Sequence, residues 1–449
     1  MDSYNHYLIA RYSWKYPHLF VDQWGKPLYN IMASPFANLG FTWVKIFNVI
    51  LWVSSAWLTF ITSKKLGFKY AWVGFLLVIV QPASLEFVIS GLTEFLNEFL
   101  LILFIYLTAS QRWNMAAFLA GLLPFARSEG FIIMAVVGFY LLFIEKKYKS
   151  LFWFAAAPIL FNFIGWFAVG DPLWIIHNPY IKAQVLGDNF CGSGSLFHYA
   201  KLSFSEFSLG MITLLLAGTI LSAIHVFKGF KKRDFVSSFI FWLCSGIFWL
   251  YFLVHSVIWW KGMMGSCGYA RVFIVVMPVM ALTGVFGLNA LISKFKTQRK
   301  IIESVVIILL IFSGVQSYNK IKRTLPSKIT PEQREYLKVA QWLQTEDYSK
   351  SKMYFLYPYL NVIANIDPYN INAFDFLWSI DLDNAPPGSL VIWDSHFGPN
   401  EGKLPYDKIN NHPGYTKVKT FAPVISFTTV HDIPYEIHIF RKDKDSLRK

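Results

Sequence analysis

Long apolar runs are the feature that most constrains how this chain folds. Of its 449 residues, 55% are hydrophobic and only 15% are charged, against about 25% charged in soluble domains. A helix of roughly 20 apolar residues crosses the hydrocarbon core of a bilayer, and a kinked or re-entrant helix needs fewer. We therefore predict an α-helical polytopic membrane protein with about ten transmembrane helices, at approximately 41–62, 70–90, 93–109, 113–126, 130–144, 151–169, 208–228, 235–258, 271–293 and 301–318.

Basic residues alternate between the connections of these predicted helices. Every second connection is rich in Lys and Arg, and five such loops together carry 15 of them: 63–69, 111–113, 145–150, 228–234 and 294–300. Lys and Arg concentrate in cytoplasmic loops, so the other connections face outward. Counting the crossings then puts residues 1–40 and 319–449 outside the cytoplasm. We expect an integral protein of a bacterial inner (plasma) membrane with an extracytoplasmic C-terminal domain.

Two domains are predicted. Residues 1–318 form the transmembrane domain and carry a net charge of +12, whereas residues 319–449 carry +2. The basicity belongs to the membrane part and reflects topology, and no nucleic-acid partner is expected. In the C-terminal region, TPEQREYLKVAQWLQ predicts a helix with Thr330 as N-cap and Pro331 at its first position. Four short β-rich runs follow, so a small α/β domain is expected there.

The chain opens with MDSYNHYLIARYSWKYP, which is unusual for an N-terminus placed outside. It lacks the basic start, apolar core and small-residue cleavage site of a signal peptide. We expect residues 1–40 to be the first outer loop, and we expect a further helix, encoded upstream of Met1, to precede it. Asp2 is either a solvated terminal acid or a carboxylate general base at the membrane surface. His6 and Asp22 are candidates for lining a substrate site.

Ionisable residues gather on the predicted outer side. Because charges near a membrane core are costly, each needs a partner or a use. Glu94 begins the predicted helix 93–109, where an acid suits the helix dipole, and this structural role competes evenly with a functional one. Arg127 lies with Glu129 in a tight outer connection, and Arg suits bidentate binding of phosphate. The alternative is a simple ion pair between Arg127 and Glu129.

The stretch HSVIWWKGMMGSCGYARVFIVVMP (255–278) is the most unusual outer segment. Arg271 opens an apolar helix on the side where the charge bias disfavours a cation, and His255 lies one turn inside the preceding span. The glycines permit close approach of the backbone to a ligand; the alternative is a glycine-softened interfacial turn. Loop 170–207 is long for a membrane connector, and its His177 is a weaker candidate for lining a sugar or lipid site.

Three cysteines are present, and none has the spacing of a metal site. Cys191 and Cys267 fall in loops on the same predicted outer side, where a disulfide between them is one of two alternatives. Cys244 lies inside an apolar span, where a thiol packs as a small hydrophobe. No metal ligands are therefore assigned from the sequence.

Several motifs, taken in order, resemble the GT-C superfamily of membrane glycosyltransferases. They are an acid in the first outer loop, WGKPLYNIMASPF (24–36), SGLTE (90–94) before a membrane helix, RSEG (127–130) between two spans, and an outer Arg ahead of MP (277–278). The nearest likeness is to the bacterial branch related to protein O-mannosyltransferases and to polyprenyl-phosphate-dependent mannosyltransferases. The resemblance covers about residues 1–318, and the C-terminal region resembles the extracytoplasmic domains that many of these enzymes carry.

This resemblance implies a bundle of about eleven or more helices. It also implies transfer of a sugar from a polyprenyl-phosphate carrier to an acceptor hydroxyl, usually with inversion. Asp2 matches the first-loop catalytic acid and Glu94 the second acidic position. Arg127 and Arg271 match positions near the donor phosphate, with Lys261 as a further phosphate-binding candidate. The chain departs from the pattern by lacking the helix before the first loop. Some members use a divalent metal, but one acid in the first loop does not establish a metal site, and no cofactor is assigned.

The sequence therefore favours a glycosyltransferase, with mannose as a candidate sugar, acting at an outward-facing site. Its partners would be a polyprenyl-phosphate sugar donor, a glycan, lipid or protein acceptor, and membrane lipids. The chemistry agrees, because a carboxylate takes the proton of an acceptor hydroxyl and Arg or Lys stabilises a departing lipid phosphate. The alternative from another class is a lipid-linked glycan transporter or flippase, and a non-catalytic scaffold is a third.

Overall fold

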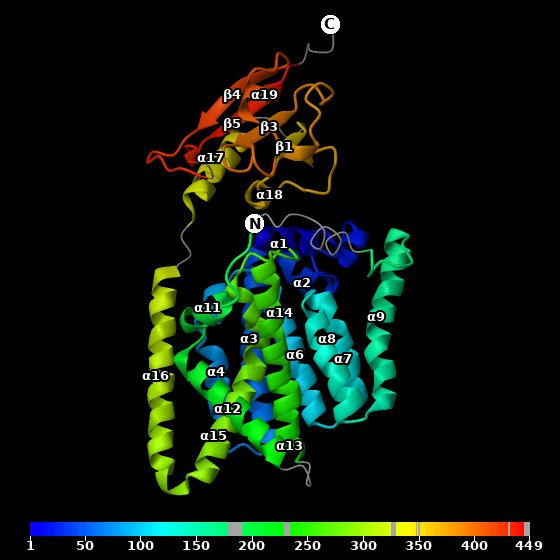
Figure 1. Cartoon of the computed structure of the whole chain (residues 1–449). Helices are drawn as coiled ribbons and strands as arrows, with labels where there is room; N and C mark the ends of the chain where they lie inside the picture. Colours follow the sequence, from blue (N-terminus) through cyan, green and yellow to red (C-terminus); the bar gives the residue numbers. More distant parts are fainter. Residues whose placement is uncertain are drawn as a thin grey trace. The chain divides into compact units, whose positions relative to one another are not determined.

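The computed structural model describes residues 1–177, 191–228, 234–324, 329–346, 348, 351–429 and 432–443 (Figure 1). The chain forms two compact units. One comprises Ile9–Pro326, and the other combines Met1–Leu8 with Ser327–Lys449. The boundary between them falls inside the first helix, α1 (Asp2–Tyr12). The first eight residues therefore fold with the C-terminal region.

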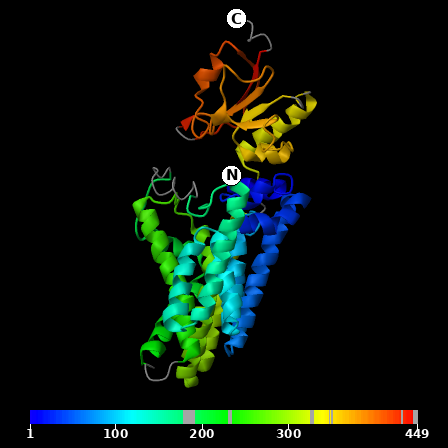
Figure 2. The same ribbon diagram turned by 90° about the vertical axis from the view of Figure 1, so that its right-hand side faces the viewer.

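The larger unit is a bundle of helices that run side by side (Figure 2). Its first half contains η1 (Pro17–Val21), α2 (Pro27–Leu39), α3 (Phe41–Lys65), α4 (Ala71–Ile79), α5 (Pro82–Phe87), α6 (Glu94–Ala109), α7 (Trp113–Ala126), α8 (Gly130–Phe139), the π-helical turn η2 (Tyr140–Ile144) and α9 (Tyr148–Val169). Its second half contains α11 (His198–Glu206), α12 (Leu209–Lys228), α13 (Phe235–Ser238), the π-helical η3 (Phe239–Ser245), α14 (Gly246–Lys261), the 3-10 helix η4 (Ala270–Val276), α15 (Met277–Lys294), η5 (Lys296–Gln298) and α16 (Arg299–Thr324). Each predicted span is mostly helical.

Six helical stretches in the described part of the chain are long and apolar enough to cross a membrane. They are Phe41–Lys65, Tyr148–Val169, Leu209–Lys228, Phe235–Lys261, Ala270–Lys294 and Lys296–Arg323. Two shorter apolar helices, Trp113–Ala126 and Gly130–Ile144, match two further predicted spans. The total of ten transmembrane helices remains a prediction. In Figure 1, α9 and α16 lie at opposite flanks of the bundle, and both leave most of their apolar surface unburied.

The structure differs from the sequence expectation in two places. The predicted span 70–90 is broken, because α4 ends at Ile79 and α5 begins at Pro82. Proline suits the first turn of a helix but cannot donate the backbone hydrogen bond that continuation of α4 requires. The opening stretch, read above as part of a loop, is the helix α1 over residues 2–12.

The centre of the bundle is held by close approach of α12 to α15. A Cβ atom added to Gly218 would lie 1.9 Å from the carbonyl oxygen of Thr283, and one added to Gly287 would lie 2.5 Å from the backbone nitrogen of Gly218. Small residues let two membrane helices pack backbone against backbone. These two helices therefore form a tight central pair, and α15 is buried along almost all of its length.

The smaller unit is built around a five-stranded mixed sheet. Its strands are β1 (Met353–Phe355), β2 (Phe374–Phe376), β3 (Leu390–Asp394), β4 (Tyr415–Phe421) and β5 (Ile437–Lys442), in the order β2-β1-β3-β5-β4. β1 pairs parallel with β2 and β3, while β5 pairs antiparallel with β3 and β4. Four strands match the predicted β-rich runs, and β2 adds a fifth. The predicted fold class, a helical membrane bundle with a small C-terminal α/β domain, is confirmed.

Short helices cover this sheet. They are α17 (Pro331–Thr345), α18 (Pro358–Ile363), η6 (Leu377–Ser379) and α19 (Tyr406–Asn410). α17 begins as the sequence predicts, with Thr330 as N-cap and Pro331 in the first turn. The Thr330 hydroxyl accepts from the backbone N–H of Gln333 (3.2 Å), whose side-chain oxygen accepts from the Thr330 N–H (3.0 Å). This capping box satisfies two of the unpaired donors at the helix start.

A disulfide joins two loops of the larger unit that are predicted to face outward. Cys191 and Cys267 are bonded, with Cα atoms 5.0 Å apart and a sequence separation of 76. Two candidate spans, Leu209–Lys228 and Phe235–Lys261, lie between them. An even number of crossings returns the chain to the side from which it left, so the bond agrees with the predicted alternation of loops. Cys244 is free and buried, as predicted.

The disulfide predicts a specific thiol count. Without reductant, a denatured chain should react with maleimide at one cysteine, and after reduction at all three. Replacing Cys191 and Cys267 with Ser should lower the free energy of unfolding by about 2–4 kcal/mol, because the open chain gains entropy when unfolded. Intact mass spectrometry counts the labelled thiols, and thermal unfolding in detergent measures the stability. Three labelled thiols in the absence of reductant would contradict the bond.

Asp394, at the end of β3, is a buried acid in the smaller unit. Its Oδ2 accepts from the Tyr336 hydroxyl (2.7 Å), and its Oδ1 accepts from the backbone N–H groups of His396 (3.0 Å) and Phe397 (2.7 Å). Burial raises the pKa of Asp394 from its usual 3.8 to about 6, and the hydrogen bonds only partly oppose this shift.

This pKa predicts pH-dependent stability. A folded-state pKa above the unfolded value means that the stabilisation is complete below pH 3.8 and is lost as the pH rises through about 6. Asp394→Asn removes this titration. We expect wild type to lose stability relative to Asp394→Asn, by about 3 kcal/mol at most, between pH 4 and pH 7.5. Thermal unfolding of both proteins across this range measures the difference in stability between them. Because both proteins contain His396, its own titration cancels in this difference. A constant difference would contradict the assignment.

Candidate active site

The segment that leads into α6 is fixed by two elements of the bundle, α2 and α3. The Tyr29 hydroxyl from α2 donates to the carbonyl of Gly91 (2.9 Å), and the Asn48 amide from α3 donates to the carbonyl of Leu92 (2.9 Å). Gly91 has a φ of 76°, in the left-handed region that favours glycine. A Cβ there would also lie 2.9 Å from the ring of Phe41. This turn delivers Glu94 to the first position of α6.

Glu94 is buried between two arginines. Its Oε1 lies 2.9 Å from Nη1 of Arg127 and 3.5 Å from Nε of Arg271. Neither contact has hydrogen-bond geometry, so both buried oxygens of Glu94 accept no hydrogen bond from any described residue. The carboxylate is therefore held by charge and by its place at the N-terminus of α6, while its lone pairs stay unfilled.

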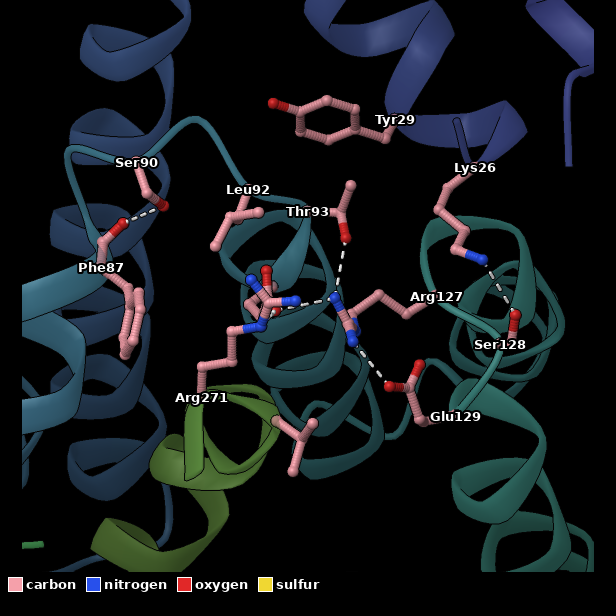
Figure 3. A network of polar contacts seen from close by, with 12 residues as sticks. Lys26, Tyr29, Phe87, Ser90, Leu92, Thr93, Arg127, Ser128, Glu129 and Arg271 are labelled. Atoms are coloured by element: carbon pink, nitrogen blue, oxygen red, sulfur yellow. Dashed lines mark hydrogen bonds and ion pairs between the residues drawn. The ribbon is translucent and has the colours of Figure 1, made fainter. Parts of the chain in front are cut away.

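Arg127 is the centre of the network in Figure 3. Its Nη1 donates to Thr93 Oγ1 (2.9 Å) and its Nη2 to Glu129 Oε1 (2.6 Å). Burial alone would raise the pKa of Glu129, but the charge and hydrogen bond of Arg127 outweigh it and lower the pKa to about 2. The ion pair between Arg127 and Glu129, one of the two alternatives read from the sequence, is present. It leaves the buried Nε of Arg127 without a hydrogen-bond partner among the described residues.

Lys26 is a member of the site that the sequence analysis did not single out. It is the N-cap of α2 and has a φ of 67°, which is uncommon for a residue with a side chain. Its Nζ donates to the hydroxyl of Ser128 (3.2 Å), one residue from Arg127 (Figure 3). Burial lowers the pKa of Lys26, while the charge of Glu129 opposes this effect. The residue stands in the WGKP motif quoted above, yet no spacing rule links it to a loop 102 residues away.

A small cavity lies beside Lys26. It has a volume of about 30 Å³ and is lined by Gln23, Lys26, Pro27, Pro124, Phe125, Ser128, Phe131, Trp174 and Ile175. The rings of Phe125 and Phe161 stack at 4.2 Å, and Trp174 lies 6.4 Å from Phe125 in a nearly parallel plane. Gln23 donates to the carbonyl of Trp174 (2.7 Å). Aromatic side chains thus line this small cavity next to the cationic group.

Two other predicted residues are fixed near this network. Asp22 Oδ1 accepts from the backbone N–H of Gly25 (2.6 Å), and burial raises its pKa. This bond shapes the turn that precedes Lys26, so Asp22 has a positioning role in the described structure. His255 is buried in α14, with its ring 4.5 Å from that of Tyr251. Its Nε2 is buried and has no described hydrogen-bond partner.

Two predicted residues are not joined to this network by any contact among the described residues. Lys261, at the end of α14, is exposed, and its Nζ lies 4.0 Å above the ring of Trp260. His177 pairs with Asp171, whose Oδ2 lies 3.0 Å from its Nδ1. The rest of its loop, residues 178–190, lies outside the described residues. Lys261 is thus an interfacial cation stacked on an aromatic ring, and its assignment to the donor phosphate remains a prediction.

Asp2 and His6 belong to the smaller unit. Asp2 is in the first turn of α1, and His6 is buried in the same helix. The ring of Tyr4 lies 5.2 Å from that of Tyr359, and Gln333 donates to its hydroxyl (2.9 Å). Burial raises the pKa of Tyr4 to about 12. The stretch that carries Asp2 is therefore an ordered helix held by the C-terminal domain. The catalytic role of Asp2 remains a prediction.

The network can bind a ligand that carries an anion and a hydroxyl group. The Nε of Arg127 offers an unused donor, and Glu94 offers unused acceptors close to it. Unsatisfied buried polar atoms are rare and call for a bound group. Three cations, Lys26, Arg127 and Arg271, stand against two carboxylates, so an added phosphate would meet favourable charge. Among the described residues, no group of three or more His, Cys, Asp or Glu side chains is arranged to hold a metal ion.

Comparison with solved structures identifies the fold. The structure of ArnT from Cupriavidus metallidurans bound to undecaprenyl phosphate superimposes with a TM-score of 0.53 and 9% identity, over 98% of this chain and 93% of ArnT. Arabinofuranosyltransferase AftD from Mycobacteria matches at a TM-score of 0.44 and 14% identity, over 92% of this chain and 37% of AftD. No protein-family model and no curated protein sequence matches. The chain has the fold of ArnT, and the predicted GT-C-type fold is confirmed.

The close contact behind Glu129 gives a testable pair of variants in α8. A Cβ at Gly130 would lie 2.4 Å from the backbone of Leu123, whereas a Cβ at Gly138 meets only Phe154, at 3.8 Å. Gly130→Ala should push α8 away from α7 and destabilise the protein by about 1–3 kcal/mol. Gly138→Ala, in the same helix, should stay within about 0.5 kcal/mol of wild type. Thermal unfolding in detergent measures both, and equal effects would contradict the packing.

Proposed function

We propose that this protein is a glycosyltransferase that moves a sugar from a polyprenyl-phosphate-linked donor to an acceptor hydroxyl at an outward-facing site. The observation that carries the proposal is the pairing of unused groups in the network. Arg127 Nε is a buried donor without a partner, and Glu94 has two buried oxygens that accept nothing from the described residues. A phosphate supplies acceptors for the first, and a sugar or acceptor hydroxyl supplies a donor for the second. The ArnT fold supports the same class of donor.

In the proposed reaction, the acceptor oxygen attacks the anomeric carbon of the donor sugar. The bond between that carbon and the phosphate oxygen breaks, and the polyprenyl phosphate leaves with both electrons. Arg127 and Arg271 bind the phosphate and stabilise its growing charge. Hydrogen-bond donors such as arginine stabilise charge strongly in a site that excludes water. A carboxylate takes the proton of the acceptor hydroxyl. The family resemblance read from the sequence gives this role to Asp2 and the second acidic position to Glu94, and mannose is the candidate sugar.

The sidedness of the site has two independent supports. Basic loops alternate along the chain, so the connections that carry Glu94, Arg127 and Arg271 are expected outside the cytoplasm. The disulfide of Cys267, four residues before Arg271, belongs to the same side, and disulfides persist mainly in oxidising compartments. We therefore propose a bacterial inner-membrane protein whose site and C-terminal domain face the periplasm.

The proposal predicts which arginines matter. Membranes that contain the protein should transfer label from polyprenyl-phosphate sugars, and Arg127→Gln or Arg271→Gln should lower the rate by about 100-fold, the usual loss for one charge-stabilising donor. Arg299→Gln is the matched control, because Arg299 is a partly exposed arginine paired with Glu303 at the start of α16. A monodisperse elution profile for each variant excludes misfolding. Full transfer by both site variants would overturn the assignment of the phosphate site.

Asp2→Asn separates the transferase from a lipid-linked glycan transporter. Loss of transfer with retained binding of the lipid donor is expected if the carboxylate is the base. A protein that moves labelled lipid across vesicles with or without this substitution, and yields no glycosylated product from any donor, would instead be a transporter.

A further inference from the structure

A second pocket lies at the other end of the bundle. It has a volume of about 730 Å³ and is lined by Gln111, Arg112, Trp113, Asn114, Met115, Lys146, Lys147, Tyr148, Lys149 and Ser150. These residues form the starts of α7 and α9, whereas Arg127 follows the last residue of α7. The pocket and the candidate active site are therefore separated by the full length of α7. Nothing in the proposed reaction uses it.

Two short connections with unusual backbone geometry build this pocket. Gln111 has a φ of 58° and Lys146 a φ of 52°. The backbone of each connection therefore passes through the left-handed region just before a helix begins. The Ser150 hydroxyl donates to the side-chain oxygen of Asn114 (2.9 Å), which ties α9 to α7. Lys147 Nζ lies 4.9 Å above the ring of Trp113. The walls are thus joined to each other, and the helices keep a defined spacing.

The charge of the pocket is one-sided. Four cations line it, Arg112, Lys146, Lys147 and Lys149, and none of the described residues in its lining is acidic. Arg112 and Lys147 also occupy the N-cap positions of α7 and α9, where neither makes a side-chain capping bond. Cations at the start of a helix oppose its dipole. This arrangement is unfavourable by itself, and a bound anion would relieve it.

The surroundings of the pocket are apolar and unburied. Met115 and Tyr148 are 57% and 60% exposed, and Phe143 and Phe152, beside them in sequence, are 64% and 71% exposed. α9, which starts at the pocket, is a candidate membrane span with only 17% of its apolar window buried inside the protein. In a membrane, such side chains would face acyl chains. A free anion would use the cations alone, whereas a lipid would use both the cations and this apolar rim.

We propose that this pocket binds the headgroup of an anionic phospholipid, whose acyl chains lie along the exposed apolar face of α9. The positive-inside rule accounts for basic residues in the loop, but it requires neither a pocket nor an apolar rim. Basic pockets between membrane helices on the cytoplasmic side bind anionic lipid headgroups by the same physics. The site would hold lipid in the leaflet opposite to the candidate active site.

The test uses the full chain, purified in detergent and examined by native mass spectrometry with added phosphatidylglycerol. We expect the wild-type protein to retain the lipid, and Lys146→Gln/Lys147→Gln/Lys149→Gln to retain it about tenfold or more weakly, since each basic residue adds several-fold to binding of an anionic lipid. Lys64→Gln/Lys65→Gln/Lys69→Gln is the matched control. It removes the same charge from another basic loop on the same predicted side and should retain the lipid like wild type.

Three results would overturn the proposal. They are equal loss of lipid in both triple variants, undiminished retention in the pocket variant, and equal retention of phosphatidylcholine by wild type. Inorganic phosphate that displaces phosphatidylglycerol completely at millimolar concentration would identify a free anion as the ligand instead. Arg112→Gln alone provides a second pocket variant if the triple variant does not fold, and it should weaken retention by several-fold.

Discussion

The structure of the larger unit depends on one buried group of charges. Glu94, Arg127 and Glu129 lie where helices end at a membrane surface, with Arg271 and Lys26 at the edge. A buried charge without a partner is strongly destabilising, so these side chains must be brought together or not be there at all. That requirement fixes the end of α7, the start of α6 and the entry to α15 against one another, although they come from distant parts of the chain.

The same group of charges has hydrogen-bonding atoms without described partners. Counted as ion pairs, the group is nearly balanced, but counted as hydrogen bonds it is incomplete, because Arg127 Nε and both oxygens of Glu94 have no described partner. A purely structural cluster has no reason to leave strong donors and acceptors unused in a buried place. The proposed transferase accounts for them, because a ligand with phosphate and hydroxyl groups would complete the network on binding.

Much of this architecture was predictable from the sequence, for identifiable reasons. Apolar runs located the helices to within a few residues, since the bilayer fixes their length and composition. Glu94, Arg127 and Arg271, which the structure brings together, were singled out because charges near or within membrane spans are costly. The sequence analysis did not single out Lys26, because lysines are common in loops. Only the three-dimensional path of the chain brings Lys26 to Ser128.

Other features needed long-range packing that no local pattern contains. The break at Pro82 was hidden by the apolar residues on both sides, and the helix α1 was hidden by its polar and aromatic composition. The first eight residues of the chain pack with a domain that lies more than 300 residues away in the sequence, through Tyr4 and Gln333 among others. Hydrophobic periodicity cannot identify such a partner. It shows which side of a helix is buried, but it does not show which element covers that side.

The disulfide between Cys191 and Cys267 has a consequence for how the protein is made. The bond encloses a loop of chain that contains α12 and the helix from Phe235 to Lys261. Oxidation must wait until both of these helices have been inserted and the second cysteine has emerged beside the first. The bond thus records the insertion of these two helices, whereas α15 and α16 follow later in the chain. A chain that stalls before the second of the two helices is inserted would keep its thiols, which distinguishes it chemically.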